Sequence, residues 1–274
     1  MEASGMDYRA IAMETVRILA DGGYTCGGRR VDILEECKRA VEASRLIAPE
    51  DWAGMVIPSR RGETACTVTN RSAVDAVLDF ARQGLDRVGV LNFASARNPG
   101  GGFLNGAMAQ EESLASSSGL YPALLAHPLY YERNRACRSM LYTDHAIYSP
   151  GVVFFRDGRF RLVEKPASAA VLTLPAVNRG AALRQGEDPA LADGRMRARM
   201  RLALLAFAAM GDTRLILGAF GCGVFRNDPA MVAAEWEALL SGEFAGVFER
   251  VEFAVLDRTA ERACYAPFAA RFGR

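Results

Sequence analysis

Apolar residues follow two helical patterns in the first part of the chain. One runs over residues 8–20 and the other over residues 31–47, with apolar side chains recurring among polar ones every three or four positions. Two Gly-Gly pairs between residues 22 and 28 break the chain between these patterns. We therefore expect residues 1–62 to form an N-terminal helical extension, followed by a main domain over residues 63–274.

From Thr64 onward, short runs rich in β-branched and aromatic residues alternate with helical stretches, which is typical of a layered α/β domain. The runs predict strands over 65–69, 87–93, 146–155, 170–175, 215–219 and 250–256. Helices are predicted over 72–83, 188–210 and 228–240, beginning at the suitable N-cap residues Ser72, Asp188 and Asp228. We expect a parallel or mixed sheet with helices on both of its faces.

Composition narrows the classes of function. The chain has 33 basic and 32 acidic residues, so no overall field attracts nucleic acid, and we expect no sequence-specific nucleic-acid binding. Six scattered cysteines and only two histidines, with no C-x-x-C pair, argue against a zinc site and against a disulfide framework. We expect a cytoplasmic protein without a membrane segment, because no run of eighteen apolar residues and no signal-like N-terminus occurs.

Two glycine-rich segments each follow a predicted strand. Residues 98–106 contain three consecutive glycines, and residues 218–223 lead into the predicted helix that begins at Asp228. Glycines let backbone N–H groups approach a charged ligand, and a helix N-terminus favours an anion. Because ligands bind beyond the carboxyl ends of the strands in such sheets, we expect both loops at one rim. Together they indicate a nucleotide-like ligand.

Glu111 and Glu112 follow the triple glycine closely. Adjacent residues point in different directions, so one carboxylate is suited to transfer a proton and the other to position a substrate. A carboxyl group shielded from water has a raised pKa, which suits a general acid. The alternative is that the pair only favours the dipole of a helix that starts there.

Three segments together resemble the family of microbial-type poly(ADP-ribose) glycohydrolases. They are NFASARNPGGG, AMAQEESLASSS and GAFGCGVFRNDP, and they include the signature of three glycines, a short spacer and Gln-Glu-Glu. The resemblance covers the chain from about Thr64 to Leu256. It implies a macrodomain-like three-layer α/β/α sandwich with a mixed central sheet, preceded by a helical extension.

The resemblance also implies roles for particular residues. Glu112 would protonate the leaving ribose hydroxyl of a ribose–ribose linkage and then activate water, and Glu111 would hold the neighbouring ribose hydroxyls. Phe225 would pack on the ribose or adenine, or alternatively belong to the core. The implied substrate-binding residues are Gln110, Asn98, Pro99, Gly100, Gly101, Gly102, Gly221, Cys222, Gly223, Val224 and Phe225.

The expected function is therefore the hydrolysis of ADP-ribose polymers without a metal or a cofactor, by a monomer that takes ADP-ribose, poly(ADP-ribose) and ADP-ribosylated proteins. One alternative is the removal of single ADP-ribose units from a protein or nucleic acid. Another is a reader that binds ADP-ribose without turnover. Gln110, Glu111 and Glu112 speak against the reader, because a carboxylate beside phosphates weakens simple binding.

Overall fold

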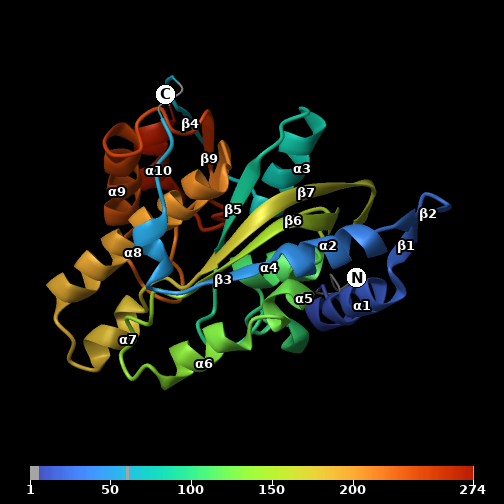
Figure 1. The fold of residues 1–274 in the computed structure, drawn as a ribbon, viewed down its shortest axis with the longest axis horizontal. Coiled ribbons are helices and arrows are strands. Elements are labelled where there is room, and N and C mark those ends of the chain that lie inside the picture. Colours follow the sequence, from blue (N-terminus) through green and yellow to red (C-terminus); the bar gives the residue numbers. More distant parts are fainter. Residues whose placement is uncertain (1–5, 60–61, 274) are drawn as a thin grey trace.

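A seven-stranded mixed sheet forms the centre of the computed structural model, which describes residues 6–59 and 62–273 (Figure 1). The strand order is β3 (Arg45–Ile47), β6 (Ala146–Arg156), β7 (Leu162–Leu174), β5 (Val88–Phe93), β8 (Arg214–Leu217), β9 (Arg250–Ala254) and β4 (Ala65–Thr69). Strand β5 pairs in parallel with both β7 and β8, and the parallel ladder continues through β9 to β4. The pairs β3–β6 and β6–β7 are antiparallel.

Helices cover both faces of this sheet (Figure 1). One core joins the sheet to α8 (Pro189–Met210), α9 (Pro229–Ser241) and α10 (Tyr265–Phe272). The other core joins it to α3 (Ala73–Arg82), α4 (Gln110–Ser117), α5 (Leu120–Leu125) and α6 (Pro128–Ala136). Within the described residues, none of the helices is both long and apolar enough to span a bilayer.

The alternation along β8 explains why both faces are covered. Leu215 and Leu217 belong to the first core, whereas Ile216 between them belongs to the second. Successive strand side chains point to opposite faces, so a run of apolar residues is buried on both sides. The predicted three-layer α/β/α architecture with a mixed sheet is thereby confirmed.

All the strands predicted from the sequence are present, and so are the three helix starts. Ser72, Asp188 and Asp228 each accept a hydrogen bond from a backbone N–H in the first turn of α3, α8 and α9. The largest difference in bounds is in β7, which begins at Leu162 and not at residue 170. Its first half carries exposed Glu164 and Lys165, which dilute the apolar pattern, and it is held by antiparallel pairing with β6.

The helix predicted over residues 31–47 is wrong at both ends. The structure has a helix, α2, only over Leu34–Ala43, between the hairpin of β1 (Gly23–Cys26) and β2 (Arg29–Asp32) and the edge strand β3. Gly27 and Gly28 have φ values of +57° and +74°, which form the tight turn of that hairpin. The N-terminal segment is therefore not purely helical, and β3 contributes to the central sheet. The division of the chain at residue 62 stays a prediction.

Helix α1 (Tyr8–Asp21) packs against α4 and the short 3₁₀ helix η2 (Phe103–Asn105), through an apolar cluster that joins Ala12 to Phe103 and Ala115. A further 3₁₀ helix, η1 (Asp51–Gly54), and α7 (Arg179–Arg184) lie in connecting segments. At the α1–α4 contact, buried Thr15 Oγ1 donates to the Ser116 carbonyl at 2.6 Å and accepts from Arg156 Nε at 3.2 Å. The N-terminal helix thus supports α4 from behind.

We expect Thr15→Val to lower the free energy of unfolding by about 1–3 kcal/mol, because it keeps the shape but leaves a buried carbonyl and a buried guanidinium N–H without their partner. Urea unfolding followed by circular dichroism measures the change. Arg17→Ala, an exposed change on the same helix, is the matched control and should stay within about 0.5 kcal/mol of the parent. Equal stability of the two variants would contradict the supporting role of Thr15.

Candidate active site

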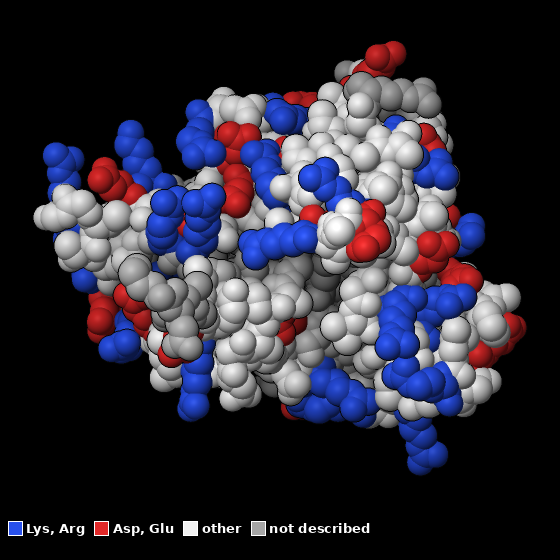
Figure 2. All heavy atoms as spheres, turned by 180° about the vertical axis from the view of Figure 1, so that it is seen from behind, with Lys and Arg blue, Asp and Glu red and all other residues white. Residues whose placement is uncertain are grey.

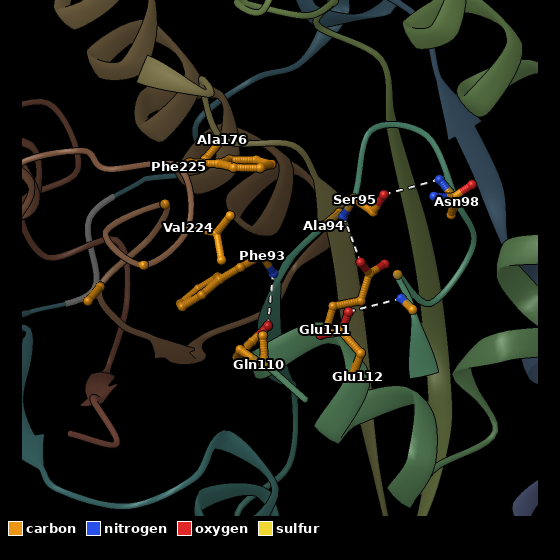
Figure 3. Close-up of a pocket in the computed structure, with 16 residues that line it drawn as sticks. Phe93, Ala94, Ser95, Asn98, Gln110, Glu111, Glu112, Ala176, Val224 and Phe225 are labelled. Atoms are coloured by element: carbon orange, nitrogen blue, oxygen red, sulfur yellow. Dashed lines mark hydrogen bonds between the residues drawn. The ribbon is translucent and has the colours of Figure 1, made fainter. Parts of the chain in front are cut away.

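The two glycine-rich loops lie at the same edge of the sheet, as predicted. One follows β5 and the other follows β8, and these strands are parallel neighbours, so their carboxyl ends meet. Between the loops is a cavity of about 380 Å³ (Figure 3). The N-terminal end of α4 closes one side of it, so the two glutamates of the first turn reach the cavity wall.

Most of the residues implied by the resemblance line this cavity. They are Asn98, Gly101, Gly102, Gln110, Glu111, Glu112, Gly221, Gly223, Val224 and Phe225. The cavity lining does not include Pro99, Gly100 or Cys222. Sequence reasoning missed Ser95 and Ala176, which also line it and which follow the ends of β5 and β7. The position of each just after a strand was the available signal.

Gln110 fixes the start of α4 to the end of β5. Its Nε2 donates to the Leu91 carbonyl at 2.8 Å. Its Oε1 accepts from the Phe93 N–H at 2.9 Å, the contact drawn in Figure 3. The side-chain amide therefore takes the place of a neighbouring strand's backbone. This double contact sets the position of the two residues that follow.

Glu111 is buried, with only 3% of its surface exposed. Its Oε2 accepts from the Ser95 N–H at 2.6 Å, and its Oε1 lies 3.4 Å from Asn92 Nδ2. Burial raises the pKa of this carboxyl group to about 8, and the nearby charge of Glu112 adds to the rise, against the opposing hydrogen bond from Ser95. The shielded carboxyl group is thus Glu111, and not Glu112, to which the resemblance assigns proton transfer.

Glu112 is half-buried and turns towards the first glycine loop (Figure 3). Its Oε1 accepts from the Gly102 N–H at 3.0 Å. A Cβ atom on Gly101 would lie 2.2 Å from that same oxygen and 3.1 Å from Glu111 Oε2. The absence of a side chain at Gly101 therefore lets the backbone approach both carboxyl groups, which places them on one wall of the cavity.

The second loop forms the opposite wall (Figure 3). Gly221 is packed tightly, since a Cβ there would lie 2.6 Å from both Ala176 Cβ and Asn227 Nδ2. Gly223 faces open space, and Val224 is 84% exposed. Phe225 lines the cavity and packs on Tyr142, with ring centroids 6.1 Å apart. Phe225 is therefore a wall residue held from behind.

Cys222 in this loop packs against the core that joins the sheet to α8, α9 and α10, and burial raises the pKa of its thiol. A thiol held protonated is a poor nucleophile, which agrees with a packing role. Asn178 caps α7 by accepting from the Ala181 N–H. Asn92 lies buried beside Glu111.

A second cavity of about 410 Å³ adjoins the first. The two share Phe93, Ala109, Gln110, Ala219 and Gly223 in their walls. The far wall of the second cavity comes from Arg71 after β4 and from Leu256 and Arg258 after β9, none of which the sequence pattern singled out. Together the cavities form one long site that crosses the carboxyl ends of β5, β8 and β9.

Comparison with known proteins finds one family model and several solved structures that are similar to this chain. The family model described as the catalytic domain of microbial-type PARG matches residues 12–157, and so begins well before Thr64. Two crystal structures of poly(ADP-ribose) glycohydrolase from Thermomonospora curvata, one bound to the inhibitor ADP-HPD, are each 46% identical over 97% of this chain and 99% of theirs, with TM-scores of 0.92 and 0.91. The Deinococcus radiodurans enzyme in complex with ADP-ribose is 43% identical over 85% of this chain and 96% of its own, with a TM-score of 0.81. No curated protein sequence matches this chain.

The raised pKa of Glu111 predicts a pH dependence of stability. The folded-state pKa is about 8 against an ordinary value of 4.5, so the folded protein keeps this proton to a higher pH than the unfolded chain. The stabilisation is complete below pH 4.5 and is lost as the pH rises through about 8. Glu111→Gln removes the titration, so the unfolding free energy of the variant relative to the parent should rise by roughly 3–5 kcal/mol across that range.

Urea unfolding at intervals of pH measures this difference, with exposed Glu132→Gln as the matched control. The Glu132 variant should follow the parent at every pH. Parallel profiles of the parent and Glu111→Gln would show that Glu111 is ionised in the folded protein throughout the range.

Proposed function

This chain belongs to the family of microbial-type poly(ADP-ribose) glycohydrolases. From that premise we propose which residues of its site carry out the hydrolysis of ribose–ribose bonds in ADP-ribose polymers. Glu112 is the general acid and base. The observation that carries this assignment is the contrast between the two glutamates. Glu112 is half-buried and held through one oxygen, whereas Glu111 is buried and engaged through both.

The single anchor of Glu112 is what proton transfer requires. Among the described residues, the Gly102 N–H is the one hydrogen-bond partner of this carboxyl group, so Oε2 stays available to a ligand in the cavity. A fixed carboxyl group with one free oxygen can meet a leaving oxygen at hydrogen-bond distance. Glu111 acts as the neighbour that positions the ribose hydroxyls.

The second loop takes the diphosphate of the terminal ADP-ribose unit. The backbone N–H groups of Gly223, Val224 and Phe225 have no hydrogen-bond acceptor within the described part of the chain. Consecutive unpaired amides form a concave site for an anion, and the positive end of α9 lies just beyond them. The adenosine half then extends into the second cavity, and the distal ribose lies in the first, beside Glu112.

Cleavage follows from this placement. Glu112 gives a proton to the ribose oxygen of the leaving chain, and the bond between that oxygen and the anomeric carbon breaks. The carboxylate then takes a proton from water, whose oxygen bonds to the anomeric carbon, and Glu112 is restored. Among the described residues that line this cavity, no second carboxylate faces Glu112 across the bond, because Glu111 lies on the same wall. The substrate's own diphosphate stabilises the positive charge that develops at the anomeric carbon.

We expect Glu112→Gln to lower kcat on poly(ADP-ribose) by roughly 10²–10⁴-fold, because it removes the transferable proton. The amide oxygen still accepts from Gly102, so the shape of the site is kept. Product analysis by chromatography measures the rate, and calorimetry with ADP-ribose measures binding. Both the parent and the variant should bind ADP-ribose with a Kd in the micromolar range or below, about −8 kcal/mol or better.

The Glu111→Gln variant is the comparison in the same assay. It should lose less of kcat than Glu112→Gln, since Glu111 transfers no proton in this scheme. Parental turnover by Glu112→Gln would overturn the assignment of the acid, and the absence of any ADP-ribose binding by the parent would overturn the placement of the substrate.

Gly101→Ala tests whether the position of the Glu112 carboxyl group matters for catalysis. The new Cβ would lie 2.2 Å from Glu112 Oε1, so the carboxyl group must move, and we expect kcat to fall by roughly 10²-fold. Gly186→Ala is the matched control, because Gly186 also has a left-handed φ, +83° against +63° at Gly101, but has open space around it. The control should lose about 1–2 kcal/mol of stability and keep its activity. Equal activity of the two variants would show that Gly101 does not determine the position of the Glu112 carboxyl group.

A further inference from the structure

The direction in which the rest of the polymer leaves the site can be followed from the two cavities. If the proposed placement holds, the terminal unit runs from the second cavity, past the amides of residues 223–225, to its distal ribose beside Glu112. The bond that breaks lies at that end. The remaining chain must therefore leave over the opposite margin, which is formed by the loop that contains Asn98 and Gly101.

Arg97 stands at that margin. It precedes Asn98 of the cavity wall, and its side chain is exposed. Its Nη2 lies 4.0 Å from Met140 Sδ, in the segment whose Tyr142 packs on Phe225. The guanidinium group thus lies outside the cavity, along the rim between the first loop and the aromatic wall.

A second arginine is fixed to the same loop. Arg135 in the last turn of α6 is exposed, and its Nη1 donates to the Arg97 carbonyl at 2.7 Å. This hydrogen bond holds the second guanidinium group against the backbone of the cavity wall. The two positive charges are therefore placed by the fold, on adjoining elements at one rim.

Neither of these two charges has an acidic partner among the described residues, whereas other arginines of the protein do. Arg179, for example, is paired with Asp193 at 2.6 Å, and Arg201 is paired with Glu243. Figure 2 shows a hollow in one face of the molecule, with Lys and Arg side chains as well as some Asp and Glu side chains around it.

We propose that Arg97 and Arg135 bind the diphosphate of the next ADP-ribose unit, on the leaving side of the cleaved bond. The leaving ribose carries its own diphosphate at its 5′ position, so two negative phosphates follow the cleaved bond along the chain. Guanidinium groups pair well with phosphate oxygens. The pair therefore recognises polymer in preference to a single terminal unit, and this inference rests on the substrate placement proposed above.

The test compares substrates with and without that second diphosphate. Poly(ADP-ribose) has it, whereas an aryl glycoside of ADP-ribose has a leaving group without phosphate. We expect Arg97→Ala to raise KM for the polymer by roughly fivefold to tenfold, and Arg97→Glu to raise it further, because a favourable charge contact is lost or reversed. For both variants, kcat on the polymer, KM for the aryl glycoside and Kd for ADP-ribose should stay within about twofold of the parent.

Salt dependence and controls complete the design. The KM of the parent for the polymer should rise with salt concentration more steeply than that of Arg97→Ala, because a charge contact is screened. Arg97→Lys should recover most of the parental KM, Arg135→Ala should act in the same direction as Arg97→Ala, and Arg17→Ala, an exposed arginine without an ion pair in the described structure, should have no effect.

Two outcomes overturn the inference. One is a parental KM for the polymer in both Arg97→Ala and Arg97→Glu, and the other is an equal change of KM for polymer and aryl glycoside. Failure of the substrate placement itself appears elsewhere, as the absence of any ADP-ribose binding by the parent. The two failures are therefore distinguishable.

Discussion

The contact of the Gln110 side chain with the end of β5 is the interaction on which the rest of the site depends. One amide group bonds to both the Leu91 carbonyl and the Phe93 N–H, and so continues the sheet sideways into the first turn of α4. The helix N-terminus cannot then slide along the strand. Because Glu111 and Glu112 are the next two residues, their positions relative to both glycine loops follow from this contact, and α1 supports the same helix from behind.

Burial of Glu111 has an electrostatic cost that the surroundings only partly offset. The Ser95 N–H stabilises the ionised form, but removal from water and the neighbouring carboxylate favour the protonated form, and the pKa rises to about 8. Buried Asn92 Oδ1 has no hydrogen-bond donor among the described residues, so an unpaired acceptor lies beside this carboxyl group. A neutral Glu111 lowers the electrostatic repulsion with Glu112, and so leaves less negative charge beside the diphosphate of the proposed scheme.

Local patterns in the sequence were enough to predict the layers of the fold, the three Asp or Ser caps and the common edge of the two loops. Edge strand β3 was mistaken for helix because its three residues become a strand only through pairing with β6, about a hundred residues later. The far wall of the second cavity was missed for a similar reason, since Arg71 and Leu256 meet there only when β4 and β9 pair. The roles within the site came from the resemblance of the motifs, since adjacent glutamates at a helix start have an ordinary structural explanation as well.

The two glycine-rich loops have similar sequences in physical terms, yet the structure gives them different tasks. In the first loop, the Gly101 N–H is paired with the Asn98 carbonyl and the Gly102 N–H with Glu112, so these amides are used within the protein. In the second loop, three successive amides have no acceptor among the described residues. In the proposed scheme, the first loop therefore positions the acid, and the amides of the second loop are available to the anion. This separation would let a carboxyl group and the proposed diphosphate share one cavity, because each negative group has its own set of N–H donors.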